Sequence, residues 1–274
     1  MESLETTTRI EGHNVLESVY RADKAIAASD LKYAVSNGLQ AFHTYKYGID
    51  NPPRVATPAM KFGSMFHKAI LEPKDFANCY QLLDDKRSKR GKELALAFQT
   101  RGIETYTSTE FDTIAAIRKS LEKNAFVSKY LINDIEGASE QSYWWTHKAT
   151  GLQCKCRCDY VIHSDMVIDL KTTGEGGASP DAFTRTIVNF KYHLQAAHYL
   201  QGTGCTKFVF VAVEKVFPYT VAVYELSGSF IEKGFQLQEQ TLQQIKQAQE
   251  SGIWAGHSDQ EPDGIKTLTP PKWI

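Results

Sequence analysis

Apolar residues along this chain follow two different spacings, and the change comes about halfway. Before residue 135 they recur three or four positions apart, which is the spacing of an amphipathic helix. This pattern predicts helices over 29–48, over 59–76 up to Pro73, and over most of 93–133. After residue 138 the runs become short and alternating, which predicts strands instead.

The second half of the chain reads as three strands, a helix, two strands and a last helix. The predicted strands cover 138–147, 152–163, 165–173, 207–215 and 219–227, and the predicted helices cover 180–201 and 228–251. This order is typical of an α/β fold, a mixed β-sheet with helices on its faces. A connector with three prolines spans 51–58, and a turn is expected at 163–165.

The length of 274 residues, with 42% apolar residues, is enough for one large domain with a buried core or for two small ones. We expect a single domain over 1–274. It would comprise a helical N-terminal part of about 1–135, an α/β core of about 136–251 and a C-terminal tail of about 252–274.

Charge and targeting signals narrow the class of protein only slightly. The chain has 31 Lys and Arg against 32 Asp and Glu, so a polyanionic partner would need a local concentration of positive charge. No basic start followed by an apolar run is present, and the longest apolar runs are about six residues, against ~20 needed to span a bilayer. An odd number of cysteines, five, favours reduced thiols and a cytoplasmic location.

The run Val-Ile-Asp-Leu-Lys at 167–171 places one acid and one base inside an apolar strand. Side chains two positions apart share a face of a strand. Ile168 and Leu170 would therefore face a core, while Asp169 and Lys171 would point together the other way.

The preceding predicted strand has the same kind of pattern. Alternation places Cys154, Cys156 and Cys158 on one face, and Lys155, Arg157 and Asp159 on the other. If the two strands are neighbours, Asp159 joins Asp169 and Lys171 on one surface. Glu140, at the start of the strand before, could reach the same surface.

Two carboxylates beside an ammonium group suit metal-assisted phosphodiester hydrolysis. Mg²⁺ takes hard oxygen ligands, typically one or two carboxylates plus phosphate oxygens and water. The metal activates water and neutralises charge on the phosphate, and a lysine can orient or deprotonate that water. A bare Asp-x-Lys is more often an exposed ion pair, but Asp159, ten residues upstream of Asp169 on an adjacent strand, favours the metal site.

These residues resemble the PD-(D/E)XK nuclease signature. Asp159 would be the first acid, and Asp169-Leu170-Lys171 would be the second motif, with Asp169 in place of the commoner Glu. Gln195-Ala-Ala-His-Tyr199 resembles the Q-x-x-x-Y element of the RecB-type branch. The segment 62–73 resembles the upstream helical histidine motif of that branch.

Five ordered blocks extend the resemblance over about 29–245, most of the chain. The blocks are TPAMKFGSMFHKAILEP, GLQCKCRCDYV, DLKTT with ASPDAF, YHLQAAHYL and FVFVAVEKVFPYTVAVYEL. Together they resemble the catalytic domain of the RecE-type exonucleases of phages and prophages, the exonuclease VIII family. The resemblance implies a restriction-endonuclease-like core with a mixed β-sheet flanked by helices.

The resemblance also implies which residues hold the metal. Asp159, Asp169 and the backbone carbonyl of Leu170 would be ligands, and Lys171 would serve the attacking water. His67 would lie at or beside the metal, although a histidine on an apolar helix is more often simply packed there.

Three further residues take catalytic roles from the same resemblance. Glu140 would orient the attacking water, and the alternative is an exposed acid at a strand edge. Gln195 and Tyr199, four residues apart on one helical face, would bind the DNA backbone and support the lysine. The alternative for them is a half-buried polar pair.

By the same resemblance the protein is a Mg²⁺-dependent exonuclease, with Mn²⁺ able to substitute. It would degrade linear double-stranded DNA from the 5′ end and leave 3′ single-stranded overhangs for recombination. Implied partners are a single-strand annealing protein of the RecT or Bet type and further copies of the chain in a trimeric or tetrameric ring, with no membrane, in a bacterial cytoplasm. The alternatives are a structure-specific or endonucleolytic DNase of the same fold, and a catalytically inactive DNA-binding module.

Two other patterns have simpler interpretations. Residues two apart on a strand lie roughly 6.6 Å apart, whereas sulfurs that share a metal lie about 2.3 Å from it. We therefore interpret the cysteines at 154, 156 and 158 as core residues rather than ligands of a metal or an iron–sulfur cluster. The basic segment 84–93 predicts an exposed loop, and residues 86–92 within it are a candidate phosphate-contacting patch.

Overall fold

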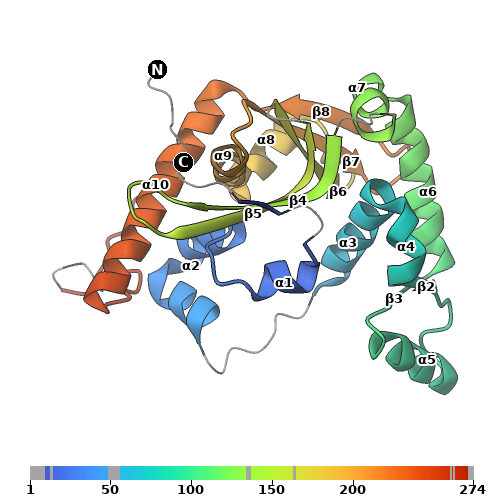
Figure 1. Cartoon of the computed structure of the whole chain (residues 1–274), viewed down its shortest axis with the longest axis horizontal. Helices are drawn as coiled ribbons and strands as arrows, with labels where there is room; N and C mark the ends of the chain where they lie inside the picture. The colour runs from blue at the N-terminus through green and yellow to red at the C-terminus, as the bar shows by residue number, and fades with distance from the viewer. Residues whose placement is uncertain are drawn as a thin grey trace.

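The computed structural model describes residues 10–12, 15–48, 56–133, 137–162, 165–259, 261 and 263–270. The helices in Figure 1 are α1 (Glu17–Ala22), α2 (Ala28–Tyr47), α3 (Pro58–Leu71), α4 (Pro73–Cys79), α5 (Lys89–Gln99), α6 (Ser108–Lys123), α7 (Ala125–Val127), the π-helical η1 (Ser128–Ile132), α8 (Pro180–Asn189), α9 (Tyr192–Thr203) and α10 (Gly228–Ser251). The strands are β1 (Ile10–Gly12), β2 (Tyr80–Leu82), β3 (Glu104–Tyr106), β4 (Gly137–Thr146), β5 (Gln153–Ile162), β6 (Met166–Thr173), β7 (Lys207–Glu214) and β8 (Val221–Glu225). Most of the predicted connector 51–58, and residues 163–164 of the predicted turn, lie outside the described residues.

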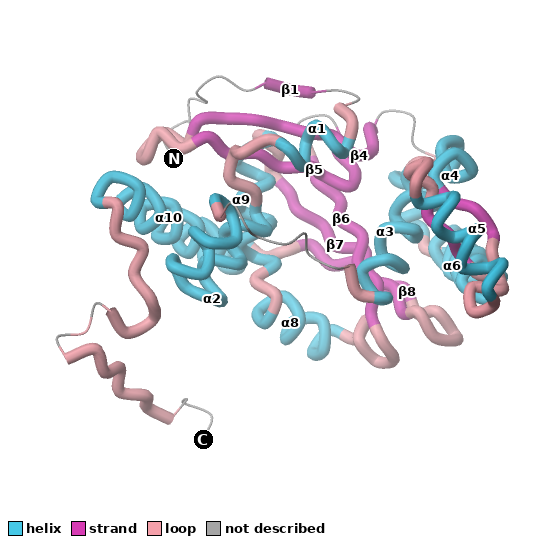
Figure 2. Tube along the Cα trace, turned by 90° about the horizontal axis from the view of Figure 1, so that it is seen from below, coloured by secondary structure: helices cyan, strands magenta, loops and turns pink. Residues whose placement is uncertain are grey.

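Six strands form one sheet in the order β1-β4-β5-β6-β7-β8. Strands β6 and β7 pair in parallel, and the other neighbours pair antiparallel. Helices α2, α8, α9 and α10 pack against one face, and α3 and α6 pack against the other (Figure 2). The predicted mixed α/β sheet flanked by helices is confirmed.

Most buried apolar residues of β5 lie on one face of this sheet, and most of those of β6 lie on the other. Cys158 of β5 packs in the core under α9, whereas Leu170 of β6 packs in the core under α3 and α6. Strict alternation would then separate Asp159 from Asp169 as well. Alternation along two regular strands, on which the prediction of a shared face was based, therefore cannot by itself bring the two acids together.

The two acids come together because β5 and β6 separate between them. Pairing of the two strands ends at Tyr160 opposite Ile168. Tyr160 packs under α3 and α6, on the face opposite to Cys158, so the alternation of β5 reverses at Asp159. Asp159 thus lies at the gap, where its Oδ2 accepts a 2.8 Å hydrogen bond from the backbone N–H of Leu170.

Strand β4 is distorted next to Asp159 of β5. Its register runs from Ser139 opposite Tyr160 to Gln141 opposite Cys158. Glu140, between them, has a φ of 52°, a left-handed conformation that is uncommon outside glycine and costs on the order of 1–3 kcal/mol. Such strained positions cluster at functional sites.

Two predictions need correction at their boundaries. The predicted helix 180–201 is two helices, because Lys191 adopts a φ of 54° between α8 and α9. The predicted loop 84–93 contains the start of α5, whose N-cap Ser88 accepts a 3.0 Å hydrogen bond from Gly91 N–H.

The N-terminal part expected to be helical also contains three short strands. Strand β1 joins the main sheet beside β4, and β2 pairs in parallel with β3 in a separate two-stranded sheet. Strands of three residues are too short to show an alternating pattern, so the sequence could not reveal them.

The described part of the predicted tail 252–274 is irregular but attached to the domain. Trp254 packs against Phe42 and His43 of α2, with ring centroids 6.0 and 4.5 Å apart. The Gln40 N–H also donates to the carbonyl of Ala255 at 3.3 Å. Across the described ranges, every helix is too short or too polar to cross a membrane.

Candidate active site

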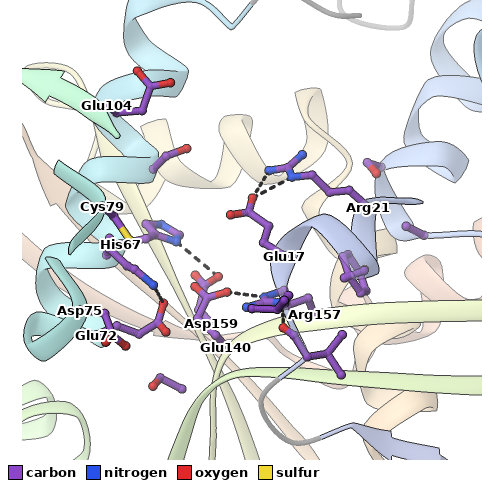
Figure 3. Close-up of a pocket in the computed structure, with 18 of the residues that line it drawn as sticks. Glu17, Arg21, His67, Glu72, Asp75, Cys79, Glu104, Glu140, Arg157 and Asp159 are labelled. Carbon is purple, nitrogen blue, oxygen red and sulfur yellow. Dashed lines mark hydrogen bonds and ion pairs between the residues drawn. The ribbon is translucent and has the colours of Figure 1, made fainter. Parts of the chain in front are cut away.

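A cavity of about 830 Å³ opens between α1 and α2 on one side and α3 and α4 on the other (Figure 3). Glu140, Arg157 and Asp159 line it from β4 and β5. Carboxylates outnumber Lys and Arg side chains among the lining residues. The cavity therefore favours a cation.

His67 projects from α3 to the gap between β5 and β6. The helix begins at Pro58 with Thr57 as its N-cap, and its apolar residues Phe66 and Ile70 are buried against the sheet. His67 Nδ1 lies 3.4 Å from Oδ1 of Asp159, and Nε2 lies 3.0 Å from the carbonyl oxygen of Leu170. The imidazole therefore bridges two oxygen atoms that the family resemblance assigns to the metal.

The charges of His67 and Asp159 support each other. Burial alone would lower the pKa of His67, but the adjacent Asp159 carboxylate raises that pKa above its usual value. Burial alone would raise the pKa of Asp159, but His67, Lys171 and the Leu170 N–H hold that pKa below its usual value. The geometry thus favours an imidazolium beside a carboxylate.

Asp169 makes a separate set of contacts on the other face of the sheet. It is 1% exposed, its Oδ1 forms an ion pair with Lys171, and its Oδ2 accepts a 2.6 Å hydrogen bond from Gln195 Nε2 of α9. The metal ligation predicted for Asp169 thus competes with contacts to both of its oxygens. The Lys171 ammonium also lies 5.0 Å from the ring centroid of Tyr192.

Burial and charge act in opposite directions on this ion pair. Burial raises the pKa of Asp169 above its usual value, against the opposing effect of Lys171. Burial would lower the pKa of Lys171, but Asp169 and Asp159 raise it above its usual value. Lys171 is therefore an ammonium, suited to stabilise negative charge rather than to take up a proton.

Glu140 lies beside Asp159 in the cavity. Its Oε2 accepts a 2.7 Å hydrogen bond from Arg157, which also donates to the carbonyl of Val15 at 3.0 Å. Burial and the negative charge of Asp159 raise the pKa of Glu140 above its usual value. The surroundings of Glu140 therefore favour its protonated form more than those of Asp159 do.

The donor atoms present fit a divalent cation. Within the described part of the chain, His67, Glu140 and Asp159 form one group whose ligand atoms all lie within 4.8 Å of one another. The carbonyl oxygen of Leu170 adds a fourth donor beside His67. Two carboxylates, one imidazole and one carbonyl suit a hard or borderline metal such as Mg²⁺ or Mn²⁺.

Tyr199 differs from the expectation of a backbone-binding residue. It lines the cavity, but its ring packs partly buried in the core, 6.1 Å between centroids from Phe208, and burial raises the pKa of its hydroxyl well above the usual value. Gln195 contacts Asp169 rather than Lys171.

Sequence reasoning missed two members of the site, Lys32 and Tyr192. Lys32 of α2 reaches Gln195, and Tyr192 begins α9 beside Lys171. Helical spacing places Tyr192 on the face of Gln195 and could have indicated it. For Lys32 the sequence offers no comparable signal, because that contact spans 163 residues.

The sequence matches the model of a known protein family. A family model described as "PDDEXK-like domain" of unknown function matches residues 40–261. The chain belongs to this family. Its PDDEXK-like fold confirms the predicted fold class and superfamily, whereas the narrower RecE type stays a prediction.

A solved structure of similar fold covers almost the whole chain. A candidate exonuclease from Eubacterium rectale is similar over 95% of this chain and 96% of its own, with 15% identity and a TM-score of 0.63. An alkaline exonuclease from Laribacter hongkongensis matches 60% of this chain and 84% of its own, with 13% identity and a TM-score of 0.32. No curated protein matches the sequence.

Proposed function

We propose that this PDDEXK-like protein is a metal-dependent deoxyribonuclease, and more narrowly a Mg²⁺-dependent exonuclease on double-stranded DNA. The main support is the group of possible metal ligands beside the gap between β5 and β6. One ligand atom each from Asp159, Glu140 and His67 lies within 4.8 Å of the other two. Lys171 pairs with the neighbouring Asp169, and its positive charge helps to hold the pKa of Asp159 below its usual value. Acids and an ammonium in this arrangement suit phosphodiester hydrolysis.

Different residues would bind the cation and orient the attacking water. Asp159, Glu140 and the Leu170 carbonyl would hold the cation. His67 would join them only after losing the proton that its raised pKa favours, and Asp169 only by giving up one of its present contacts. When bound, the cation supplies Lewis-acid chemistry, since it lowers the pKa of water and neutralises charge on the phosphate. The Lys171 ammonium would orient the attacking water and offset negative charge in the transition state.

The finer features come from the family resemblance. They are degradation from the 5′ end, 3′ overhangs for annealing, a partner of the RecT or Bet type and a trimeric or tetrameric ring. The description of the Eubacterium rectale neighbour as a candidate exonuclease supports exonuclease activity. A ring would also concentrate the positive charge that a chain of net charge −1 lacks, because each subunit turns basic residues toward a shared channel.

The deciding experiment offers three substrates to the purified protein with and without Mg²⁺. These are linear duplex labelled at the 5′ end, the same duplex labelled at the 3′ end, and a covalently closed circle. We expect Mg²⁺-dependent early release of the 5′ label and an intact circle. Cutting of the circle would instead identify an endonuclease, and binding of DNA without cleavage would identify an inactive DNA-binding module.

Light scattering and a DNA-trap assay test assembly separately. We expect a trimer or tetramer that digests long stretches after one encounter. A monomer at micromolar concentration with distributive digestion would contradict the ring and leave the proposed chemistry at Asp159 and Lys171 intact.

A further inference from the structure

Lys32 lies beside the candidate site but comes from a part of the chain that the family match does not cover. The match begins at residue 40, whereas Lys32 lies in α2 near its N-terminus. The side chain lines the cavity, and its Nζ donates a 2.9 Å hydrogen bond to Oε1 of Gln195. Helix α2 packs against α9, which carries Gln195.

The side-chain amide of Gln195 links Lys32 to Asp169 through two hydrogen bonds, an arrangement called here the relay. The amide accepts from Lys32 at Oε1 and donates from Nε2 to Asp169 Oδ2 at 2.6 Å. An ammonium can only donate and a carboxylate can only accept. The reversed amide would place oxygen against carboxylate and NH₂ against ammonium, so Lys32 fixes the orientation in which Gln195 can hold Asp169.

Lys32 and Lys171 also share a neighbour. Their ammonium groups lie 5.1 and 5.0 Å from the centroid of the Tyr192 ring, within the range of a cation–π contact. Asp169 is paired with Lys171 directly and with Lys32 only through Gln195. Burial and the positive charge of Lys171 lower the pKa of Lys32 to about 8.

We propose that Lys32 is a positioning residue of the site, which acts through the Gln195 amide to hold Asp169 against Lys171. The proposal rests on the proposed nuclease function for its effect on catalysis. It assigns Lys32 an effect on the rate of the chemical step rather than on the binding of DNA.

The test compares Lys32→Met, Lys32→Arg and the control Lys24→Met in the full chain. Lys24 is exposed and lies just before α2, so its substitution removes the same charge without touching Gln195. We expect Lys32→Met to lower kcat about tenfold or more with little change in KM, because a hydrogen bond to a charged group is lost. Lys32→Arg, which keeps a donor and a charge, should recover part of the rate, and Lys24→Met should match the wild type.

A double-mutant cycle decides whether Lys32 acts through Gln195. In a Gln195→Ala background we expect Lys32→Met to cause no further loss, because the relay is already broken. A full additional loss in that background, or a change confined to KM, would overturn the proposal and indicate direct contact with DNA.

A nuclear magnetic resonance measurement tests the relay without relying on activity. The side-chain NH₂ signals of Gln195, identified by their loss in Gln195→Ala, should shift in Lys32→Met and stay in place in Lys24→Met. Unchanged signals in a folded Lys32→Met protein overturn the proposal. A wild-type protein that cleaves no DNA overturns the nuclease function instead, whatever the signals show.

Discussion

The carboxylate of Asp159 accepts a 2.8 Å hydrogen bond from the backbone N–H of Leu170, at the point where β5 and β6 stop pairing. A side chain here takes the place of a ladder carbonyl. The contact satisfies a backbone donor that the gap would otherwise leave without a strand partner. It also holds Asp159 beside the Leu170 carbonyl and thereby sets the shape of the candidate metal site.

Asp159→Asn tests this position with little change in shape. We expect nuclease activity to fall on the order of 10²–10³-fold, because a charged cation ligand is lost. The amide oxygen can still accept from Leu170, so circular dichroism should show a folded protein. Asp159→Ala should lose at least as much activity, and near-wild-type rates in either folded variant would remove Asp159 from the site.

Lys171→Ala should abolish activity and also destabilise the protein. It leaves the buried Asp169 carboxylate without its ion partner, which typically costs about 3–5 kcal/mol of unfolding free energy. The double variant Asp169→Asn with Lys171→Met removes both charges and should recover much of the stability, as measured by urea denaturation. Recovery of activity in that double variant would show that the ammonium is dispensable.

The His67–Asp159 pair should give a defined pH dependence. The raised pKa of His67 means that its contribution to stability is complete below the ordinary value of 6.5 and is lost as pH rises through the raised value. The lowered pKa of Asp159 means that its contribution is complete above 3.8 and is lost as pH falls through the lowered value. The pair therefore contributes most between these two ordinary values.

A titration of the His67 ring by nuclear magnetic resonance in chelator-treated protein measures the pKa directly. We expect a value above 6.5 in the wild type. In Asp159→Asn the lowering effect of burial meets less opposition, so the pKa should fall. An unchanged pKa in that variant would mean that the two side chains do not interact in solution.

The buried cysteines should contribute packing rather than metal binding. Sγ of Cys156 lies 3.9 Å from Sγ of Cys158, closer than strand spacing alone suggested, but burial raises the pKa of the Cys158 thiol well above its usual value. A protonated thiol is a poor metal ligand. We expect Cys156→Ala to lower the free energy of unfolding by about 1–2 kcal/mol and to retain activity, and the half-exposed Cys79→Ala to change stability less.

Elemental analysis of protein purified under air checks the same interpretation. We expect no stoichiometric iron or zinc and no visible charge-transfer absorption. One equivalent of either metal, lost in Cys156→Ala, would assign the sulfurs a ligand role.

Local sequence patterns were enough to predict the elements of the core and the residue types of the site. Alternation over β5 and β6 and helical spacing over α10 are local patterns, so they predicted these elements almost to the residue. The order of strands and helices predicted the mixed sheet. The Asp159 and Asp169-x-Lys171 motif depends only on positions along the chain, and the PDDEXK-like family match agrees with it.

How these residues contact one another depends on the three-dimensional packing of the chain. Alternation assumes that a strand pairs without interruption. In β5, however, the alternation of side-chain faces reverses at Asp159, and Glu140 on the neighbouring strand β4 adopts a left-handed φ. The contact of His67 with Leu170 spans 103 residues and that of Lys32 with Gln195 spans 163, so no local pattern encodes either. These contacts depend on how α3 and α2 pack on opposite faces of one sheet, because the packing of whole elements brings distant side chains within hydrogen-bonding distance.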